Sequence, residues 1–363
     1  MATNLNRLRK LYVSAATKET TYGTAIATDS QIKADAGVIT NREVGVVNNN
    51  DTIGGTEEPT EQFLTNKSVA LPIAQGRVKP HTLATMAAYG MSKVTTSTPG
   101  GASSARKHQI TTSGSDGDTL YSFTVEGVLG GASSIQKIYP GMFVDGFNFS
   151  VNRGANQFAS LTSTCYGCGT VTETTDTDRS EISEDPISGS VAGACIATGV
   201  YDGTTDDSNN VVTSFDFASA VDITSQLNSF EYAYQNNVDR DFLYQVGGGK
   251  IYNIAEKTAR TQTVTITKLW QDDTYRTGLY NQTEYSLQAR FKGAQIVSEG
   301  IYYGCCFTIP KAVLQSADVS DDGGRLVETL TFLPLWDATA TGTPNPFGSV
   351  LIDIFNTQTA YAG

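Results

Sequence analysis

The sequence predicts a mainly β protein made of two tandem modules, each with one short helix and one long hairpin. The composition is the first observation behind this prediction: the 363 residues are 39% hydrophobic and include 35 glycines together with many Ser and Thr residues. Apolar and polar residues also alternate over long stretches, which is the period of a half-buried strand. Finally, one order of elements occurs twice, and the length is sufficient for two domains.

The first half presents this order of elements in four segments. Residues 54–73 contain a Gly-rich turn, a polar arm and an alternating strand, and residues 79–92 follow as a short helix. A strand comes next at 121–128, and a long hairpin closes the half within 141–169. Each segment is short, as expected for a β domain with turn signals between its strands.

The second half repeats the four segments in the same order. A Gly-rich turn, a polar arm and a strand occupy 247–266, and a second short helix is expected within 271–282. A strand at 285–293 and a hairpin at 307–335 complete the half. The recurrence of this order predicts two copies of one module.

Each hairpin strand has an apolar side and a polar side. Phe147, Phe149 and Val151 alternate with polar residues in the first hairpin, and the turn falls at 152–154; in the second hairpin the turn falls at 321–324. One side of each hairpin therefore packs on a core, and the other meets water or a polar partner. The polar sides include Asn148, Ser150, Asn152, Ser316, Asp318, Thr329 and Thr331.

The expected domain boundaries follow from composition. The first module covers 1–169 and contains a polar, Gly/Ser-rich insertion at 95–118, which is expected to be a mobile surface loop. An acidic linker or exposed insertion follows at 170–210, and the second module covers 211–363.

Charge and cysteine content narrow the class of protein. The formal net charge of −12 argues against nucleic-acid affinity, because binding DNA depends on Lys and Arg that neutralise phosphates. No stretch approaches the roughly 20 apolar residues of a membrane span, and the apolar segment near the N-terminus is too short for a signal peptide. Five cysteines, an odd number, agree with a reducing compartment, so a cytoplasmic origin is expected.

Catalytic patterns are weak throughout the chain. The two histidines, His81 at the start of the first helix and His108 in a polar segment, are expected to be structural. The GGGK at 247–250 resembles a phosphate-binding loop, but Tyr244 stands where the first glycine belongs and Ile251 where Ser or Thr is needed. We therefore expect a protein that is not an enzyme and has no cofactor.

A zinc site has a partial pattern. Cys165 and Cys168 have the spacing of a zinc half-site, which Cys305 and Cys306 could complete. Adjacent cysteines are poor tetrahedral partners, so buried free thiols are the expected state.

A calcium loop also has a partial pattern in the second hairpin. Asp318, Ser320, Asp322 and Gly323 match the first half of such a loop, but Thr329 occupies the position of the closing Glu. A plain hairpin turn is the expected structure.

Three segments in this order resemble the major tail proteins of long-tailed bacteriophages, which form the tail tube. They are KETTYGTA at 18–25, FTVEG at 123–127 followed by the hairpin at 139–167, and FTIPKAVLQSADVSDDGGRLVETLTFLPL at 307–335. The resemblance covers most of the chain apart from the two insertions.

The resemblance implies a structural virion protein, assembled in the cytoplasm of the host bacterium, in which each tandem module is a β-sandwich or partly rolled sheet with a flanking helix. Its long hairpins would join neighbouring subunits in a continuous β-barrel. Stacked rings would then conduct DNA without binding it specifically, and the tape measure, terminator and distal tail proteins would be further partners. The polar residues of the two hairpins become candidates for facing the channel: Asn148, Ser150, Asn152, Ser316, Asp318, Thr329 and Thr331.

Two questions stay open at this point. Tube proteins of this family form six-membered rings from one module per chain, so two modules favour three chains per ring, whereas one larger module would require six. The alternative function is a two-domain β-sandwich that binds to or decorates a virion, and hollow tubes in electron micrographs would separate it from a tube protein.

Overall fold

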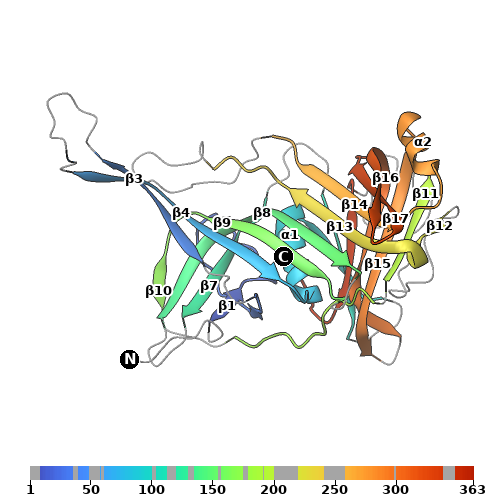
Figure 1. Ribbon diagram of the computed structural model, residues 1–363. Helices are drawn as coiled ribbons and strands as arrows, with labels where there is room; N and C mark the ends of the chain where they lie inside the picture. The colour runs from blue at the N-terminus through green and yellow to red at the C-terminus, as the bar shows by residue number, and fades with distance from the viewer. Residues whose placement is uncertain are drawn as a thin grey trace.

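The described residues fold into one open antiparallel sheet with two α-helices, as the computed structural model shows (Figure 1). A mainly β fold was predicted from the sequence, and this part of the prediction is confirmed. The structure describes residues 9–35, 40–48, 58, 61–99, 104–112, 120–129, 135–153, 157–174, 179–190, 192–199, 220–240, 258–297, 300–337 and 348–363.

The elements occur in two series that we call the first and second repeat. The first repeat comprises β1 Lys10–Val13, β2 Ser30–Ile32, β3 Asn41–Asn48, β4 Gln62–Gln75, α1 Pro80–Met91, β5 Lys93–Ser97, β6 Arg106–Thr111, β7 Phe123–Leu129, β8 Ile135–Asn152, β9 Ser160–Gly167 and β10 Thr172–Thr174. The second repeat comprises β11 Ala192–Thr198, β12 Val221–Asp222, the 3₁₀ turn Thr224–Gln226, β13 Leu227–Gln235, β14 Thr261–Leu269, α2 Thr274–Tyr280, β15 Glu284–Val297, β16 Ile301–Asp322, β17 Arg325–Pro334 and β18 Leu351–Asn356.

Eight strands from both repeats form a continuous row. Their order is β3, β4, β9, β8, β13, β14, β17, β16, and each strand pairs with its neighbour in the row. The pairing of β8 with β13, which we call the inner seam, joins the two repeats, so the halves share one sheet.

Irregularities in the sheet recur at matching places in the two repeats. The β8–β9 register skips one residue between Val144 and Gly146, and the β16–β17 register skips one between Leu314 and Ser316. A second irregularity, between β7 and β8, likewise recurs between β15 and β16. These shared bulges align the repeats residue by residue, with Val144 matching Leu314 and Gly146 matching Ser316.

The helix predicted at 79–92 is confirmed as α1, which begins at Pro80, a residue whose missing N–H is harmless in a first turn. All residues of α1 are buried, as expected for a helix that is apolar or small on every side. The helix contacts β8 on one side and β6 and β18 on another. Four rings, Phe149, Phe230, Phe291 and Phe307, extend the core beneath the inner seam, with centroids 4.9–6.5 Å apart.

The expectation of a mobile surface loop at 95–118 is wrong for residues 106–111. These residues form β6, which pairs with β5 on one edge and β18 on the other, and Lys107–Thr111 are buried. Lys107 is neutralised there by Asp353, whose carboxylate lies 3.6 Å from its Nζ. Residues 100–103 and 113–118 lie outside the described residues.

The expectation of an acidic linker or exposed insertion at 170–210 is wrong for β11. Strand β11 pairs with β15 over seven residues and is largely buried, so it belongs with the second repeat. The small apolar run at 192–197 is the local signal for this strand. The expected boundary near residue 210 lies outside the described residues, as do the GGGK segment at 247–250 and the Gly-rich turn at 54–57.

The second hairpin matches its prediction closely. Strands β16 and β17 meet at Gly323 and Gly324, whose φ angles of +62° and +86° suit glycine. Asp321 and Asp322, expected in the turn, instead end β16 and pair with β17. In the first hairpin, Gly154 of the expected turn lies outside the described residues.

Candidate functional site

One side of the eight-strand row carries short polar residues, and we call this side the polar face. Its first cross-strand line consists of directly opposed residues on five neighbouring strands: Asn152, Ser229, Thr267, Thr329 and Asp318. Directly opposed residues of an antiparallel pair lie on the same side of the sheet. The hairpins of both repeats therefore present their polar residues on one surface.

A second line runs parallel to the first. It consists of Ser150, Glu231, Thr265, Thr331 and Ser316, again opposed pair by pair. All residues of the two lines are half-buried or exposed.

Asn148 continues the polar face toward β9, because it lies opposite Thr162 on one side and Ala233 on the other. All seven residues expected to face a channel thus share one surface: Asn148, Ser150, Asn152, Ser316, Asp318, Thr329 and Thr331.

The alternation of the strands explains this separation of sides. On β8, Phe147, Phe149 and Val151 are buried between the polar positions, and on β13 Phe230 and Tyr232 are buried in the same way. A period of two places all of these side chains in the core and leaves the polar ones on the far side of the sheet.

Hydrogen bonds hold the polar side chains against the sheet. Asn148 Nδ2 donates to Glu231 Oε1 at 2.5 Å, and the hydroxyls of Ser150 and Ser160 lie 2.7 Å apart. Such cross-strand bonds restrict the orientations of these side chains.

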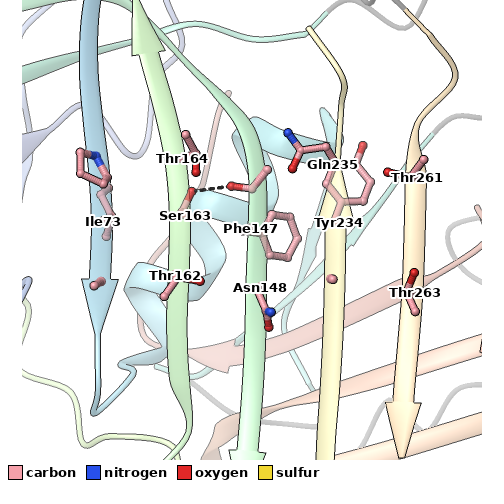
Figure 2. Close-up of a pocket in the computed structure, with 14 residues that line it drawn as sticks. Ile73, Phe147, Asn148, Thr162, Ser163, Thr164, Tyr234, Gln235, Thr261 and Thr263 are labelled. Atoms are coloured by element: carbon pink, nitrogen blue, oxygen red, sulfur yellow. Dashed lines mark hydrogen bonds between the residues drawn. The ribbon is translucent and has the colours of Figure 1, made fainter. Parts of the chain in front are cut away.

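The polar face is hollowed in two places. Figure 2 shows the first hollow, of about 410 Å³, where Thr162, Asn148, Gln235 and Thr263 lie on neighbouring strands in front of α1. The second, of about 440 Å³, lies at the hairpin ends and is lined in part by Arg153 and Asp322. A concave polar wall can hold water or a passing polar solute.

Charge varies along the polar face. The only charged members of the two lines are Glu231 and Asp318. Positive charge lies nearer the margins: Arg240 Nη1 is 3.6 Å from Glu43 Oε2 and its guanidinium stacks 3.7 Å from the Tyr166 ring, while Arg153 lines the second hollow. The middle of the face is therefore neutral to acidic.

Both histidines lie in the interior, away from the polar face. His81 Nδ1 lies 2.9 Å from Tyr361 Oη and Nε2 lies 3.1 Å from Ser30 Oγ, and burial lowers the pKa of His81 to about 3. Burial likewise lowers the pKa of His108 to about 4, and this ring contacts Asn356 Oδ1 at 3.0 Å. Both rings are neutral near pH 7 and hold parts of the core together.

The four cysteines considered as zinc ligands are free and buried, Cys165 and Cys168 at the end of β9 and Cys305 and Cys306 in β16. Across the residues that the structure describes, no three His, Cys, Asp or Glu side chains are grouped to hold a metal ion.

The residues considered for calcium lie mostly in regular structure. Asp318, Ser320 and Asp322 belong to strand β16, and Gly323 begins the turn. A strand spreads successive side chains apart, whereas a calcium loop wraps them around the ion.

Sequence reasoning did not place the two central strands of the polar face beside the hairpins: a strand was expected within 247–266, which overlaps β14, whereas β13 was not predicted. Strands β13 and β14 contribute Ser229, Glu231, Thr265 and Thr267. Their signal was present in the alternation of Phe230, Tyr232 and Tyr234 and in the run TQTVTIT at 261–267. Hairpins are easier to predict from sequence, because both of their strands and the turn are contiguous in the chain.

Among the helices in the described ranges, none has the length and apolar character needed to cross a membrane.

Comparison with known proteins agrees with the architecture. A family model described as phage tail tube protein matches residues 10–347. A search of curated proteins finds no match. Since the family match spans both repeats and nearly the whole chain, the protein belongs to the phage tail tube protein family.

Proposed function

We propose that copies of this protein close into rings that stack into the tail tube, with the polar face lining a channel through which the genome passes. Membership of the family makes the protein a structural component of the virion tail. The observation that carries the finer proposal is the unbroken polar face across strands of both repeats. A wide aqueous barrel needs this alternation of an outer apolar side and an inner polar side.

The chemistry of the polar face suits passage of DNA. Phosphates are attracted by Lys and Arg, and such contacts dominate non-specific DNA binding. The two lines of the face instead carry hydroxyls together with Glu231 and Asp318. A polyanion would meet water and weak repulsion there, so the proposed role is conduction without binding or catalysis.

Three chains per ring is the stoichiometry that we propose. Each repeat contributes four strands to the row, in matching order and with matching bulges. Three chains then supply six equivalent repeats. The competing arrangement, six chains per ring, treats each chain as a single unit and gives the matched bulges no role.

The alternative of a two-domain binding or decoration protein has less support. Separate domains would each bury their own sheet edges, whereas β8 and β13 pair across the two repeats. Tape measure, terminator and distal tail proteins remain the proposed partners at the ends of the tube.

End-on electron micrographs of assembled tubes test the stoichiometry. Averaged images with threefold symmetry, which look sixfold only at low resolution, would support three chains per ring. Sixfold symmetry that persists at side-chain resolution would contradict this stoichiometry.

Replacing Ser150 and Thr331 with Lys tests the channel lining. We expect tubes of normal shape, and virions that eject DNA more slowly, with a rate that depends more steeply on salt because each Lys attracts phosphate. The matched control is Ser150→Gln with Thr331→Gln, which adds bulk without charge. The proposal fails if the Lys variant forms tubes whose ejection equals that of the control.

A further inference from the structure

We infer that successive chains in a ring join by pairing β16 of one copy with β3 of the next, in the same register in which β8 pairs with β13 inside one chain. This inference rests on the proposed assembly and names the edges and residues that carry it.

The inner seam is the template. In it, Gly146 lies opposite Gln235, Phe147 opposite Tyr234, and Asn148 opposite Ala233. The seam is antiparallel and extends to Asn152, at the end of β8. In the inner seam, the C-terminal half of the long strand β8 pairs with β13, which is the first strand of the second repeat in the row.

The corresponding edges are open at the two ends of the row. From Leu314 to Asp322, β16 pairs with β17 alone in the described part of the chain, and β3 pairs with β4 alone. These two strands are separated by six others and lie at opposite ends of the sheet (Figure 1). Open edges tend to pair with another chain, and natural proteins cover or block them.

The shared bulges fix the match on the β16 side. Because Gly146 and Ser316 both follow the skipped residue, Phe147 corresponds to Ala317 and Asn148 to Asp318.

The residues of β3 that correspond to β13 are found through the neighbouring strands in the row, β4 and β14. Gln235 lies opposite Thr261 of β14, which corresponds to Ser68 of β4, and Ser68 lies opposite Glu43. Gln235 therefore corresponds to Glu43. Carried over from the inner seam, the register between copies places Ser316 opposite Glu43, Ala317 opposite Arg42, and Asp318 opposite Asn41.

Charge agrees with this choice of partner. The open edge of β16 ends in Asp318, Asp321 and Asp322, all exposed, and Arg42 of β3 is exposed as well. Two such acidic edges of β16 repel each other, whereas β3 carries one charge of each sign, Arg42 and Glu43, and so has no net charge. The acids thus discourage β16 from pairing with itself and favour the head-to-tail contact that a closed ring needs.

The test is a cysteine pair in one chain, Ser316→Cys with Glu43→Cys, assembled into tubes and oxidised. Opposed residues of an antiparallel pair have Cα atoms about 4.5–5.5 Å apart, within the range of a disulfide. All five native cysteines are free and buried. The control is Ser316→Cys with Arg42→Cys, since a neighbouring residue points to the opposite side of the strand.

Non-reducing gels read the result. We expect most of the 38.7 kDa chain to shift into covalent oligomers that end at the closed ring in the test pair, and less than about a tenth to do so in the control. Tubes that form without a crosslink, or that crosslink through the control pair, overturn the inference and leave the proposed function intact. Absence of tubes from the unaltered protein as well overturns the proposed function.

Hydrogen exchange of the unaltered protein covers the case in which the cysteine variants do not fold. Those backbone amides of residues 41–43 and 316–318 that point away from β4 and β17 should exchange at least about tenfold more slowly in tubes than in dissociated subunits, because they gain strand partners. Unchanged exchange in both segments would contradict the seam between copies.

Discussion

The two helices occupy matching places in the two repeats, yet one is enclosed and the other is open. All twelve residues of α1 are buried, whereas Gly278 alone is buried in the seven residues of α2, and Tyr280 is 79% exposed. Each helix follows the corresponding strand, β4 or β14, and contacts the corresponding hairpin strand, β8 or β16. The difference lies in what covers each helix, because β6 and β18 pack against α1 and neither packs to a comparable extent against α2.

The sheet edges show the same difference. The second half of β8 has neighbours on both edges, and the second half of β16 has a described neighbour on one edge. Among the described residues, the chain therefore covers these surfaces of the first repeat and leaves the same surfaces of the second repeat uncovered. This asymmetry suits the proposed assembly, because a surface that is already covered within the chain is not available to another copy.

The largest expected difference between the repeats concerns Phe149 and its counterpart Val319. Phe149 is fully buried among the rings beneath the inner seam, so Phe149→Ala should lower the free energy of unfolding of the subunit by about 3–5 kcal/mol. Val319 is half-buried at the open edge, and Val319→Ala should cost about 1 kcal/mol in the subunit. Urea unfolding of dissociated subunits measures both. Equal losses would contradict the stated difference in burial between the two positions.

The second prediction exchanges a buried ion pair for the residues of the other repeat. Lys268 Nζ lies 3.2 Å from Glu328 Oε2, and both side chains are buried. The matching positions of the first repeat hold Gln75 and Leu161, which also lie opposite each other. Glu328→Leu alone should destabilise the subunit by about 3 kcal/mol, because it leaves Lys268 buried without a carboxylate.

Adding Lys268→Gln to Glu328→Leu installs the residue pair of the first repeat and should recover most of that loss in urea unfolding. A double variant no more stable than Glu328→Leu would mean that the ion pair itself is required in the second repeat.

The smallest predicted effect concerns the carboxylates at the start of each helix. Glu184 Oε2 accepts the His81 N–H of α1 at 2.8 Å, and burial raises the pKa of Glu184 to about 7. Near α2, hydrogen bonds from Thr274 hold the pKa of the exposed Asp272 below its ordinary value. One carboxyl group is thus covered in the folded chain, and the other is in water.

Glu184 should therefore contribute a loss of stability of about 2 kcal/mol as pH rises from 5 to 8, because the folded state keeps a proton that the unfolded chain releases. His81 and His108 contribute in the opposite direction over the lower part of this range, because the unfolded chain binds protons that the folded state does not. Glu184→Gln should remove the opposing contribution, so that stability in urea unfolding rises more steeply with pH than in the unaltered protein, and Asp272→Asn should leave the pH dependence between 5 and 8 unchanged. An unchanged pH dependence in Glu184→Gln would contradict the prediction.

The sequence was sufficient to predict those elements whose signals lie within a few neighbouring residues. Both helices and both hairpins were predicted because their alternation, proline and glycine residues act over a few positions. It was insufficient where partners are distant: Lys107 and His108 look like surface residues until Asp353 and Asn356 are placed beside them.

The candidate site divides in the same way. The alternation of polar and apolar residues in the hairpins identified seven residues of the polar face. This alternation does not reveal which strands become neighbours in the sheet. The inner seam pairs residues near 150 with residues near 230, and only this long-range pairing brings Glu231 next to Asn148 and Ser150.

The inner seam also has a kinetic consequence. Because β8 and β13 belong to one chain, their contact forms at an effective concentration that the connecting segment sets, of the order of millimolar for a short flexible tether. That contact does not weaken when the protein is dilute. In a ring of such chains, every second junction would already be made before two molecules meet. Nucleation of the tube would then depend on a lower power of subunit concentration than it would for the same number of repeats supplied as separate chains.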